Sequence, residues 1–189
     1  MAFDPEDNKN KPILKYLGDK KVLVVGTSQV LRSALRSFAK MYGVGKILNA
    51  STLNEAMNLL DDELPEIIIT EFQISGKQVT PLIIKHRELI PNRLNTITVF
   101  VGETGLSPAS SKALDEDVDI FVLKPFTVEK LEQSFLTEVI KRLRPSQYDL
   151  LMDEINALYI KGEHDSCLEL VNECLKDAPD KADPYALKG

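Results

Sequence analysis

The chain is poor in the residues that build zinc sites and disulfide bonds. Its 189 residues include two cysteines, Cys167 and Cys174, and two histidines, His86 and His164. The cysteines are seven positions apart in a segment with helical periodicity, so about 10 Å separates them along one helix face, which is too far for a disulfide bond. A structural zinc site needs four clustered ligands. We therefore expect no metal site, and we expect both cysteines to be small buried residues of a helix interface.

Long apolar runs and an excess of positive charge are also missing. No stretch approaches the roughly 18 apolar residues of a membrane span, and residues 1–11 are polar, unlike the apolar core of a signal peptide. The net charge is −6, with 23 Lys and Arg against 29 Asp and Glu, whereas binding of nucleic-acid phosphates requires a basic face. The sequence thus predicts a cytoplasmic protein without membrane or nucleic-acid partners.

What the chain does contain is a regular alternation of apolar runs and amphipathic segments. Strands are predicted at residues 22–25, 46–50, 67–69, 97–101 and 120–123, and the continuous apolar runs at 22–25 and 67–69 indicate burial on both faces. Helices are predicted after them at residues 30–41, 53–60, 79–89, 108–114 and 127–143. This order predicts a doubly wound α/β domain with a five-stranded parallel sheet over residues 20–144. Residues 1–19 form an N-terminal extension with an apolar patch of Ile13, Leu14, Tyr16 and Leu17, either a short helix packed on the domain or a tether.

The residues at the carboxyl ends of the strands, where ligands gather in such sheets, point to a family. The segment Phe121-Val122-Leu123-Lys124-Pro125-Phe126 resembles the lysine–proline signature of response-regulator receiver domains. In that family the phosphate-accepting aspartate precedes the lysine by a little over fifty residues, and here Glu71 precedes Lys124 by 53. Thr27, at the end of the first strand, precedes Glu71 by 44, as does the family's acidic pair. The resemblance covers residues 20–143 and implies a flavodoxin-like receiver fold.

The departures from the family imply a degenerate pocket. A receiver accepts phosphate on its aspartate while magnesium bridges the acidic pair and the phosphoryl oxygens. Gly26 and Thr27 supply no carboxylate, Glu71 replaces the acceptor, and either Val101 or Gly102 stands where the family has a hydroxyl residue. Lys124 alone keeps its usual residue type. We therefore expect that magnesium binding is lost and that the domain works without phosphorylation.

Two questions about this pocket stay open in the sequence. Glutamate reaches further than aspartate, so Glu71 and Lys124 either mimic an activated state or are polar relics at the mouth of the sheet. Phe121 takes the position of the family's switch aromatic, three residues before the lysine. Without the hydroxyl residue we expect a static ring, serving either as a partner contact or as core packing.

Residues 148–189 carry helical patterns without strands, after a break at Arg144-Pro145-Ser146. In a 34-residue frame that begins at Tyr148 they resemble tetratricopeptide repeats. Gly162 falls at the turn, Cys167 and Cys174 at small-residue positions, Pro179 at the terminal proline, and Tyr185 and Gly189 at the aromatic and glycine positions of a second repeat. Ile155 replaces a usual glycine, which puts close packing of the first helix in doubt. Because about three repeats are needed for a stable core, we expect the chain to be a piece of a longer protein.

The functional prediction is a signalling module that is not an enzyme. It acts through protein–protein contact, with the helical repeats as a second binding surface and homodimerisation as one option. In the family, the face that here comprises residues 107–114, 121–123 and 128–143 usually meets partners. One rival is a true phosphate acceptor that uses Glu71 or an unconventional residue. Another is a small-molecule sensor that uses the emptied pocket. No cofactor is expected.

Overall fold

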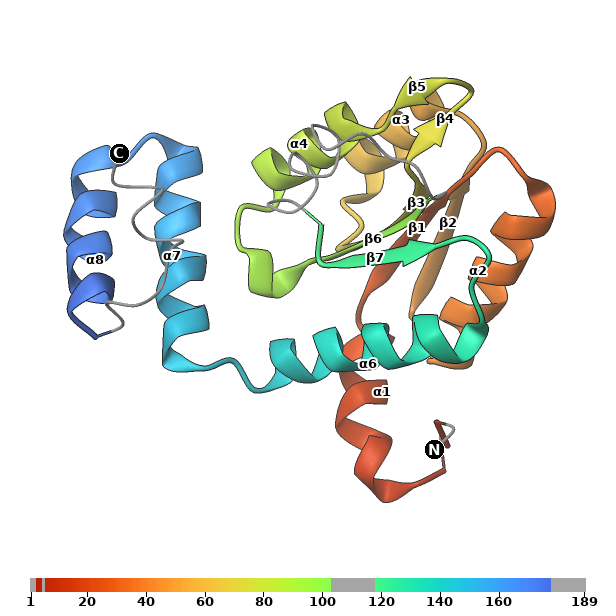
Figure 1. Cartoon of the computed structure of the whole chain (residues 1–189), viewed down its shortest axis with the longest axis horizontal. Coiled ribbons are helices and arrows are strands. Elements are labelled where there is room, and N and C mark those ends of the chain that lie inside the picture. Colours follow the sequence, from red (N-terminus) through yellow and green to blue (C-terminus); the bar gives the residue numbers. More distant parts are fainter. Residues whose placement is uncertain (1–2, 5, 103–117, 178–189) are drawn as a thin grey trace.

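A single parallel sheet forms the centre of the computed structural model, which describes residues 3–4, 6–102 and 118–177 (Figure 1). Its strands are β1 (Lys21–Val25), β2 (Lys46–Ala50), β3 (Ile67–Glu71), β6 (Ile97–Gly102) and β7 (Ile120–Leu123), in the order β2-β1-β3-β6-β7. All neighbouring pairs are parallel. The five predicted strands and the doubly wound α/β fold are confirmed.

Helices cover both faces of the sheet (Figure 1). Helices α2 (Gln29–Met41) and α6 (Val128–Leu143) pack on one face, and α3 (Leu53–Glu63) and α4 (Thr80–Leu89) pack on the other. Successive residues of the inner strands therefore enter opposite cores, and β1 and β3 contain continuous apolar runs. Ser28, Thr52 and Thr127 cap α2, α3 and α6 by accepting a backbone N–H bond. The helix predicted at residues 108–114 lies outside the described residues.

The N-terminal extension is a packed helix. After a 3-10 turn, η1 (Asn8–Asn10), helix α1 (Lys11–Gly18) buries Ile13 and Leu17 in the core that α2 and α6 share. The packed-helix alternative is therefore confirmed, and the tether alternative is wrong. The crossing at the end of α1 is tight, because a Cβ on Gly45 would lie 2.1 Å from the carbonyl oxygen of Gly18, so only glycine fits there.

A small hairpin beyond β3 was not predicted. Strands β4 (Gln73–Ile74) and β5 (Lys77–Gln78) pair antiparallel across a two-residue turn. Ser75 and Gly76 both have positive φ, at 52° and 77°, as tight hairpin turns require. Two-residue strands are too short to show the alternation by which strands are recognised in a sequence.

The C-terminal segment is a helical hairpin of α7 (Gln147–Lys161) and α8 (His164–Asp177). Gly162 ends α7 in the left-handed conformation, with φ of 77°, as expected of a turn glycine. Ile155, Cys167, Val171 and Cys174 form the hairpin's own core, and both cysteines are free thiols. The doubt about Ile155 is resolved, because this residue is fully buried and its carbonyl oxygen lies 3.7 Å from the Cys167 sulfur. The small facing cysteine makes room for the larger isoleucine. Pro179, Tyr185 and Gly189 lie outside the described residues.

The hairpin is fastened to the α/β domain next to the short 3-10 turn η2 (Arg93–Asn95). The Asp153 carboxylate in α7 accepts hydrogen bonds from the Leu94 backbone N–H, at 2.9 Å, and from the Asn92 side-chain amide, at 3.1 Å. No helix within the described ranges is long and apolar enough to cross a membrane.

Candidate functional site

The predicted pocket residues meet at the carboxyl edge of the sheet. Glu71 ends β3, Thr27 follows β1, and Lys124 follows β7. One oxygen of the Glu71 carboxylate, Oε1, accepts a hydrogen bond from Lys124 Nζ at 2.7 Å. The other, Oε2, accepts bonds from the Thr27 backbone N–H at 2.7 Å and the Thr27 hydroxyl at 3.1 Å. A single carboxylate therefore joins the ends of three strands.

Gly26 completes this pocket by having no side chain. A Cβ at position 26 would lie 3.1 Å from Glu71 Oε2 and 3.5 Å from the Cγ of Arg32. The Glu71 carboxylate thus reaches into the space beside residue 26 that an acidic side chain would need. The longer glutamate side chain can be accommodated at position 71 because Gly26 has no side chain in the space that the carboxylate occupies.

Glu71 is held in its charged form. The residue is 8% exposed, and burial alone would raise its pKa. Hydrogen bonds from Lys124 and Thr27 and the positive charge of Lys124 outweigh that penalty and lower the pKa of Glu71 below its ordinary value. Near neutral pH the pocket therefore contains a carboxylate paired with an ammonium group.

Arg32 is part of the pocket, and the sequence analysis missed it. Its guanidinium Nη1 donates to the carbonyl oxygens of Gly26 and Thr27, the latter at 3.0 Å. These bonds hold the turn that aims the Thr27 N–H at Glu71. An arginine one turn into the helix that follows the first strand was the only available signal.

Val101 contributes packing and backbone contacts. It pairs with Glu71 across β3 and β6, is 1% exposed, and accepts a bond from the Phe72 N–H at 3.3 Å. The next carbonyl, of Gly102, accepts the Lys124 N–H at 2.7 Å. No hydroxyl group is available at either position to bind a phosphoryl oxygen.

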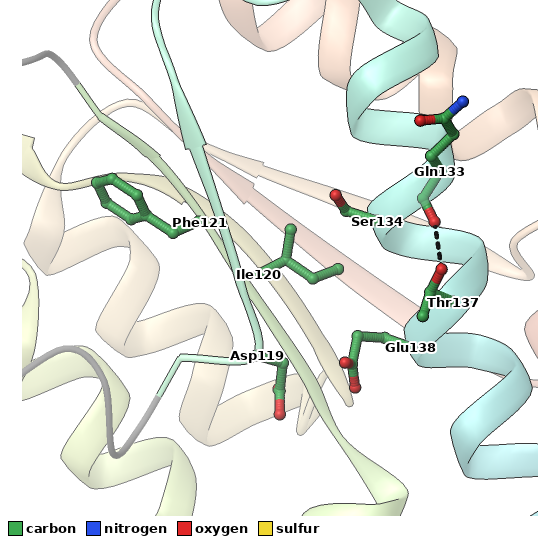
Figure 2. A pocket seen from close by; sticks show the side chains of 7 residues that line it. All are labelled: Asp119, Ile120, Phe121, Gln133, Ser134, Thr137 and Glu138. Carbon is green, nitrogen blue, oxygen red and sulfur yellow. Dashed lines mark hydrogen bonds between the residues drawn. The ribbon is translucent and has the colours of Figure 1, made fainter.

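Phe121 lies apart from the Glu71 pocket. It belongs to β7, an edge strand, and is 40% exposed, so core packing is the wrong description of this ring. Figure 2 shows Phe121 on the side of β7 away from α6. The same strand borders an open cavity of about 350 Å³ whose lining residues are Asp119, Ile120, Phe121, Gln133, Ser134, Thr137 and Glu138. No residue of the Glu71 pocket belongs to that lining.

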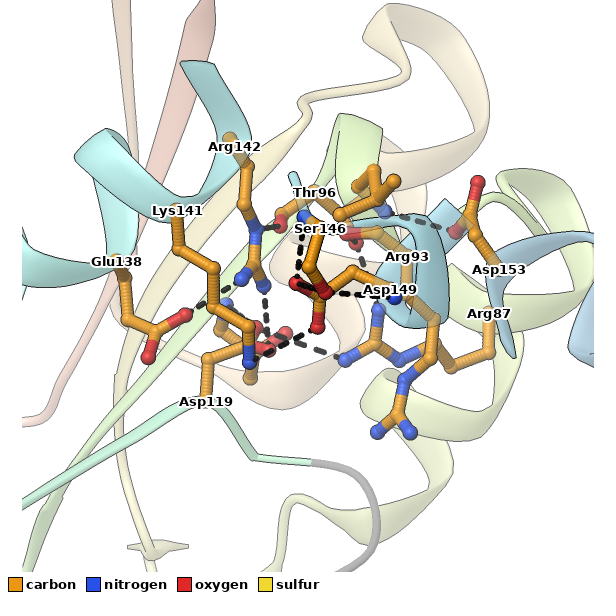
Figure 3. A network of polar contacts seen from close by, with 12 residues as sticks. Arg87, Arg93, Thr96, Asp119, Glu138, Lys141, Arg142, Ser146, Asp149 and Asp153 are labelled. Carbon is orange, nitrogen blue, oxygen red and sulfur yellow. Dashed lines mark hydrogen bonds and ion pairs between the residues drawn. The ribbon is translucent and has the colours of Figure 1, made fainter. Parts of the chain in front are cut away.

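A second polar cluster lies at the opposite, amino-terminal edge of the sheet (Figure 3). Asp119 accepts bonds from the Thr98 backbone N–H at 2.7 Å and from Arg142 at 2.6 Å. Arg142, with a side chain 3% exposed, also pairs with Glu138, and Arg87 lies 3.6 Å from Asp119. Buried charges need such partners, so this cluster anchors α6 to β6 and β7.

Solved structures with a similar fold are response-regulator receiver domains. One from Clostridium thermocellum has a TM-score of 0.56 at 14% identity, covering 65% of this chain and 96% of that domain. A CheY-like receiver from Methanospirillum hungatei JF-1 has a TM-score of 0.58 at 16% identity, covering 67% and 98%. One from Pseudomonas putida has a TM-score of 0.52 at 23% identity, covering 62% and 96%. No family model and no curated protein matches the chain.

These neighbours define the fold of the chain. It has the five-stranded flavodoxin-like receiver fold, followed by two C-terminal helices.

The donor set at the carboxyl edge does not fit the magnesium ion of a receiver. Magnesium binds carboxylate oxygens and water in an octahedral arrangement. Here Glu71 is the one carboxylate of the pocket as described, and the chain's own donors engage both of its oxygens. The described part of the chain contains no group of three or more His, Cys, Asp or Glu residues that could hold a metal ion.

Proposed function

We propose that this chain is a receiver-like signalling module that works by protein–protein contact and without phosphorylation, and that it has no enzymatic activity. The observation that carries the proposal is the engagement of Glu71 by Lys124 and Thr27. In this arrangement the chain's own ammonium and N–H groups neutralise the Glu71 carboxylate, as a bound metal ion would otherwise do.

Phosphate transfer to Glu71 would have to break this arrangement. The attacking oxygen would lose either the Lys124 ion pair or both Thr27 hydrogen bonds. No second carboxylate at Gly26 or Thr27 would help a metal ion stabilise the incoming charge. The energetic balance therefore favours the ion pair over the acyl phosphate.

Of the two interpretations of the pair, a fixed signalling state is the better supported. A relic would leave Glu71 and Lys124 as separate solvated groups. Instead, Glu71 is 8% exposed and joins the ends of β1, β3 and β7. We therefore propose that the Glu71–Lys124 ion pair holds the pocket in a single signalling state.

Two surfaces support a role in protein binding. On β7 and α6, Phe121, Leu123, Val128 and Ile140 are exposed, at 40%, 37%, 53% and 50%. On the C-terminal hairpin, Leu150, Tyr159 and Leu168 are exposed, at 45%, 52% and 42%. Exposed apolar groups of this kind mark interaction sites. We propose that the hairpin is tetratricopeptide-like and is the second binding surface.

The test is incubation of the full chain with acetyl phosphate and magnesium, followed by intact mass measurement. We expect no phosphoryl adduct. The matched control is Glu71→Gln, which keeps the shape of the side chain but not its nucleophilic carboxylate. An adduct on the wild type that Glu71→Gln abolishes would establish phosphorylation at Glu71. An adduct that survives in Glu71→Gln would establish an unconventional acceptor. Either result would overturn the proposal.

A further inference from the structure

Helix α2 presents an exposed basic face that no described element covers. The helix contains Arg32, Arg36 and Lys40 and no acidic residue, although the chain as a whole has a net charge of −6. Arg32 is engaged by the carbonyl groups of the pocket. Arg36 and Lys40 are exposed, and neither side chain has a hydrogen bond or ion pair within the described residues. Val30 on the same helix is 80% exposed, and Met41 is 44% exposed.

The C-terminal hairpin carries the opposite charge. Residues 147–177 contain eight acidic residues and two lysines, which accounts for a net charge equal to that of the whole chain. On α8, Asp165, Glu169 and Glu173 follow one another at intervals of four and are exposed. Leu168, 42% exposed, lies beside them. None of the three carboxylates has a hydrogen bond or ion pair within the described residues.

The two faces match in spacing as well as in charge. Arg36 and Lys40 are four residues apart, and so are Glu169 and Glu173, so each pair spans about 6 Å along its helix axis. Two helices laid side by side can therefore bring both cations to both anions. Each helix also has an exposed aliphatic side chain, Val30 on α2 and Leu168 on α8.

The two faces of one molecule lie too far apart to meet. In Figure 1, α2 is at one end of the molecule, and the α7–α8 hairpin is at the other, with the sheet between them. We infer that the α8 face of one molecule docks on the α2 face of a second copy, in a head-to-tail contact. Such a contact leaves one face free at each end, so further copies can add to it in an open chain or a closed ring.

The expected strength follows from the exposure of the charges. Exposed ion pairs contribute little each, and two single helix faces bury less area than a stable interface does. We therefore expect a dissociation constant on the order of 0.1–1 mM at low ionic strength. The screening length falls from about 30 Å at 0.01 M salt to about 3 Å at 1 M. High salt should therefore dissociate the two molecules.

The test uses sedimentation of the full chain with pairs of charge reversals. At low salt the weight-average mass of the wild type should rise with concentration above the monomer mass of 21.2 kDa, and it should return to that mass at high salt. Arg36→Glu/Lys40→Glu and Glu169→Lys/Glu173→Lys should each remain monomeric. Mixing these two variants should restore association, because the unchanged α8 face of the first meets the unchanged α2 face of the second. The two reversed faces are also opposite in charge, so the two variants should alternate along the chain. Lys130→Glu and Asp62→Lys, which reverse exposed charges elsewhere, should associate as the wild type does.

Three outcomes would overturn the inference. A wild type that stays monomeric at low salt and millimolar concentration would show that the two faces do not bind one another. Association that neither pair of reversals affects would place the contact on another surface. Loss of association in only one of the two variants would indicate a symmetric contact, α2 with α2 or α8 with α8.

Discussion

The Glu71 carboxylate and the Lys124 ammonium group, 53 positions apart in the sequence, lie 2.7 Å apart in the folded chain. The lysine side chain is 31% exposed and the glutamate side chain 11%. The pair therefore lies between a solvated surface pair, which contributes little, and a fully buried pair, whose disruption is costly. The hydrogen bonds of Thr27 fix its geometry and raise its contribution above that of an ordinary surface pair.

The first prediction concerns the energy of this pair. Glu71→Gln should lower the free energy of unfolding by about 1–3 kcal/mol, because the amide cannot neutralise Lys124 and presents an N–H group to one of the donors. A double-mutant cycle with Lys124→Met, measured by urea denaturation, should give a coupling energy of about 0.5–2 kcal/mol.

The matched control is the surface pair Lys46–Glu63, 2.7 Å long, with a lysine side chain 51% exposed. Its cycle, with Lys46→Met and Glu63→Gln, should give a smaller coupling energy, because solvent screens the charges. Equal coupling in the two cycles would show that the Glu71 pocket gives its ion pair no special environment.

The second prediction concerns magnesium. Gly26→Asp alone should destabilise the chain by about 1–3 kcal/mol, because its Cβ would meet Glu71 Oε2 at 3.1 Å and its charge would face another carboxylate. The triple variant Gly26→Asp/Thr27→Asp/Glu71→Asp should gain stability on addition of magnesium, because it restores three carboxylates and shortens the residue that fills the site.

Thermal unfolding with and without millimolar magnesium measures this effect. The melting temperature of the wild type should not change on addition of the ion. A shift in the wild type as large as that in the triple variant would mean that Glu71 alone, despite its contacts with Lys124 and Thr27, supports a magnesium site.

The third prediction concerns His86, which is fully buried and contacts the Pro65 carbonyl oxygen through Nε2 at 2.9 Å. Burial and the neighbouring charge of Arg87 lower the pKa of His86 from 6.5 to about 4. Above pH 6.5 the residue is neutral in both the folded and the unfolded chain. As the pH falls from 6.5 to 4, only the unfolded chain takes up the proton, so the free energy of unfolding falls by about 3 kcal/mol.

Urea denaturation at a series of pH values should show this loss in the wild type. His86→Gln, which keeps a donor for Pro65 but does not titrate, should lack this component, so the stability difference between the two chains should change with pH between 6.5 and 4. A difference that stays constant over that range would contradict a buried neutral histidine.

The strands were predictable because of how they are buried. Val22 and Val24 enter one core and Leu23 and Val25 the other, so no polar residue interrupts the run. The positions of Gly26, Glu71 and Lys124 followed in turn, since the carboxyl ends of parallel strands share one edge. The sequence thus contained the outline of the pocket.

Contacts that depend on backbone direction were not predictable in this way. The Thr27 N–H binds Glu71 because the turn after β1 points it there, and Arg32 holds that turn through two carbonyl groups. A residue pattern records side chains and says nothing of where an N–H group points. The exposure of Phe121 was undecided for a related reason, because residues of an edge strand alternate between a covered and an open face, and the sequence does not say which element covers each.

The last prediction concerns the attachment of the C-terminal hairpin. Asp153 in α7 accepts bonds from the Leu94 N–H and the Asn92 amide, so one carboxylate bridges the hairpin and the segment before β6 (Figure 3). Asp153→Ala removes the acceptor and should weaken the attachment by about 1–3 kcal/mol. Both parts keep their own buried clusters, one of them around Ile155 and Cys167. We therefore expect the helical content measured by circular dichroism to stay unchanged while cleavage at residues 144–146 by a limiting amount of protease becomes faster.

The control is Glu154→Ala, at the exposed neighbouring position, which should leave the cleavage rate as it is. Equal rates in the wild type and Asp153→Ala would show that the covalent link and other contacts hold the hairpin in place, whereas a loss of helix would show that Asp153 supports the fold of the hairpin itself.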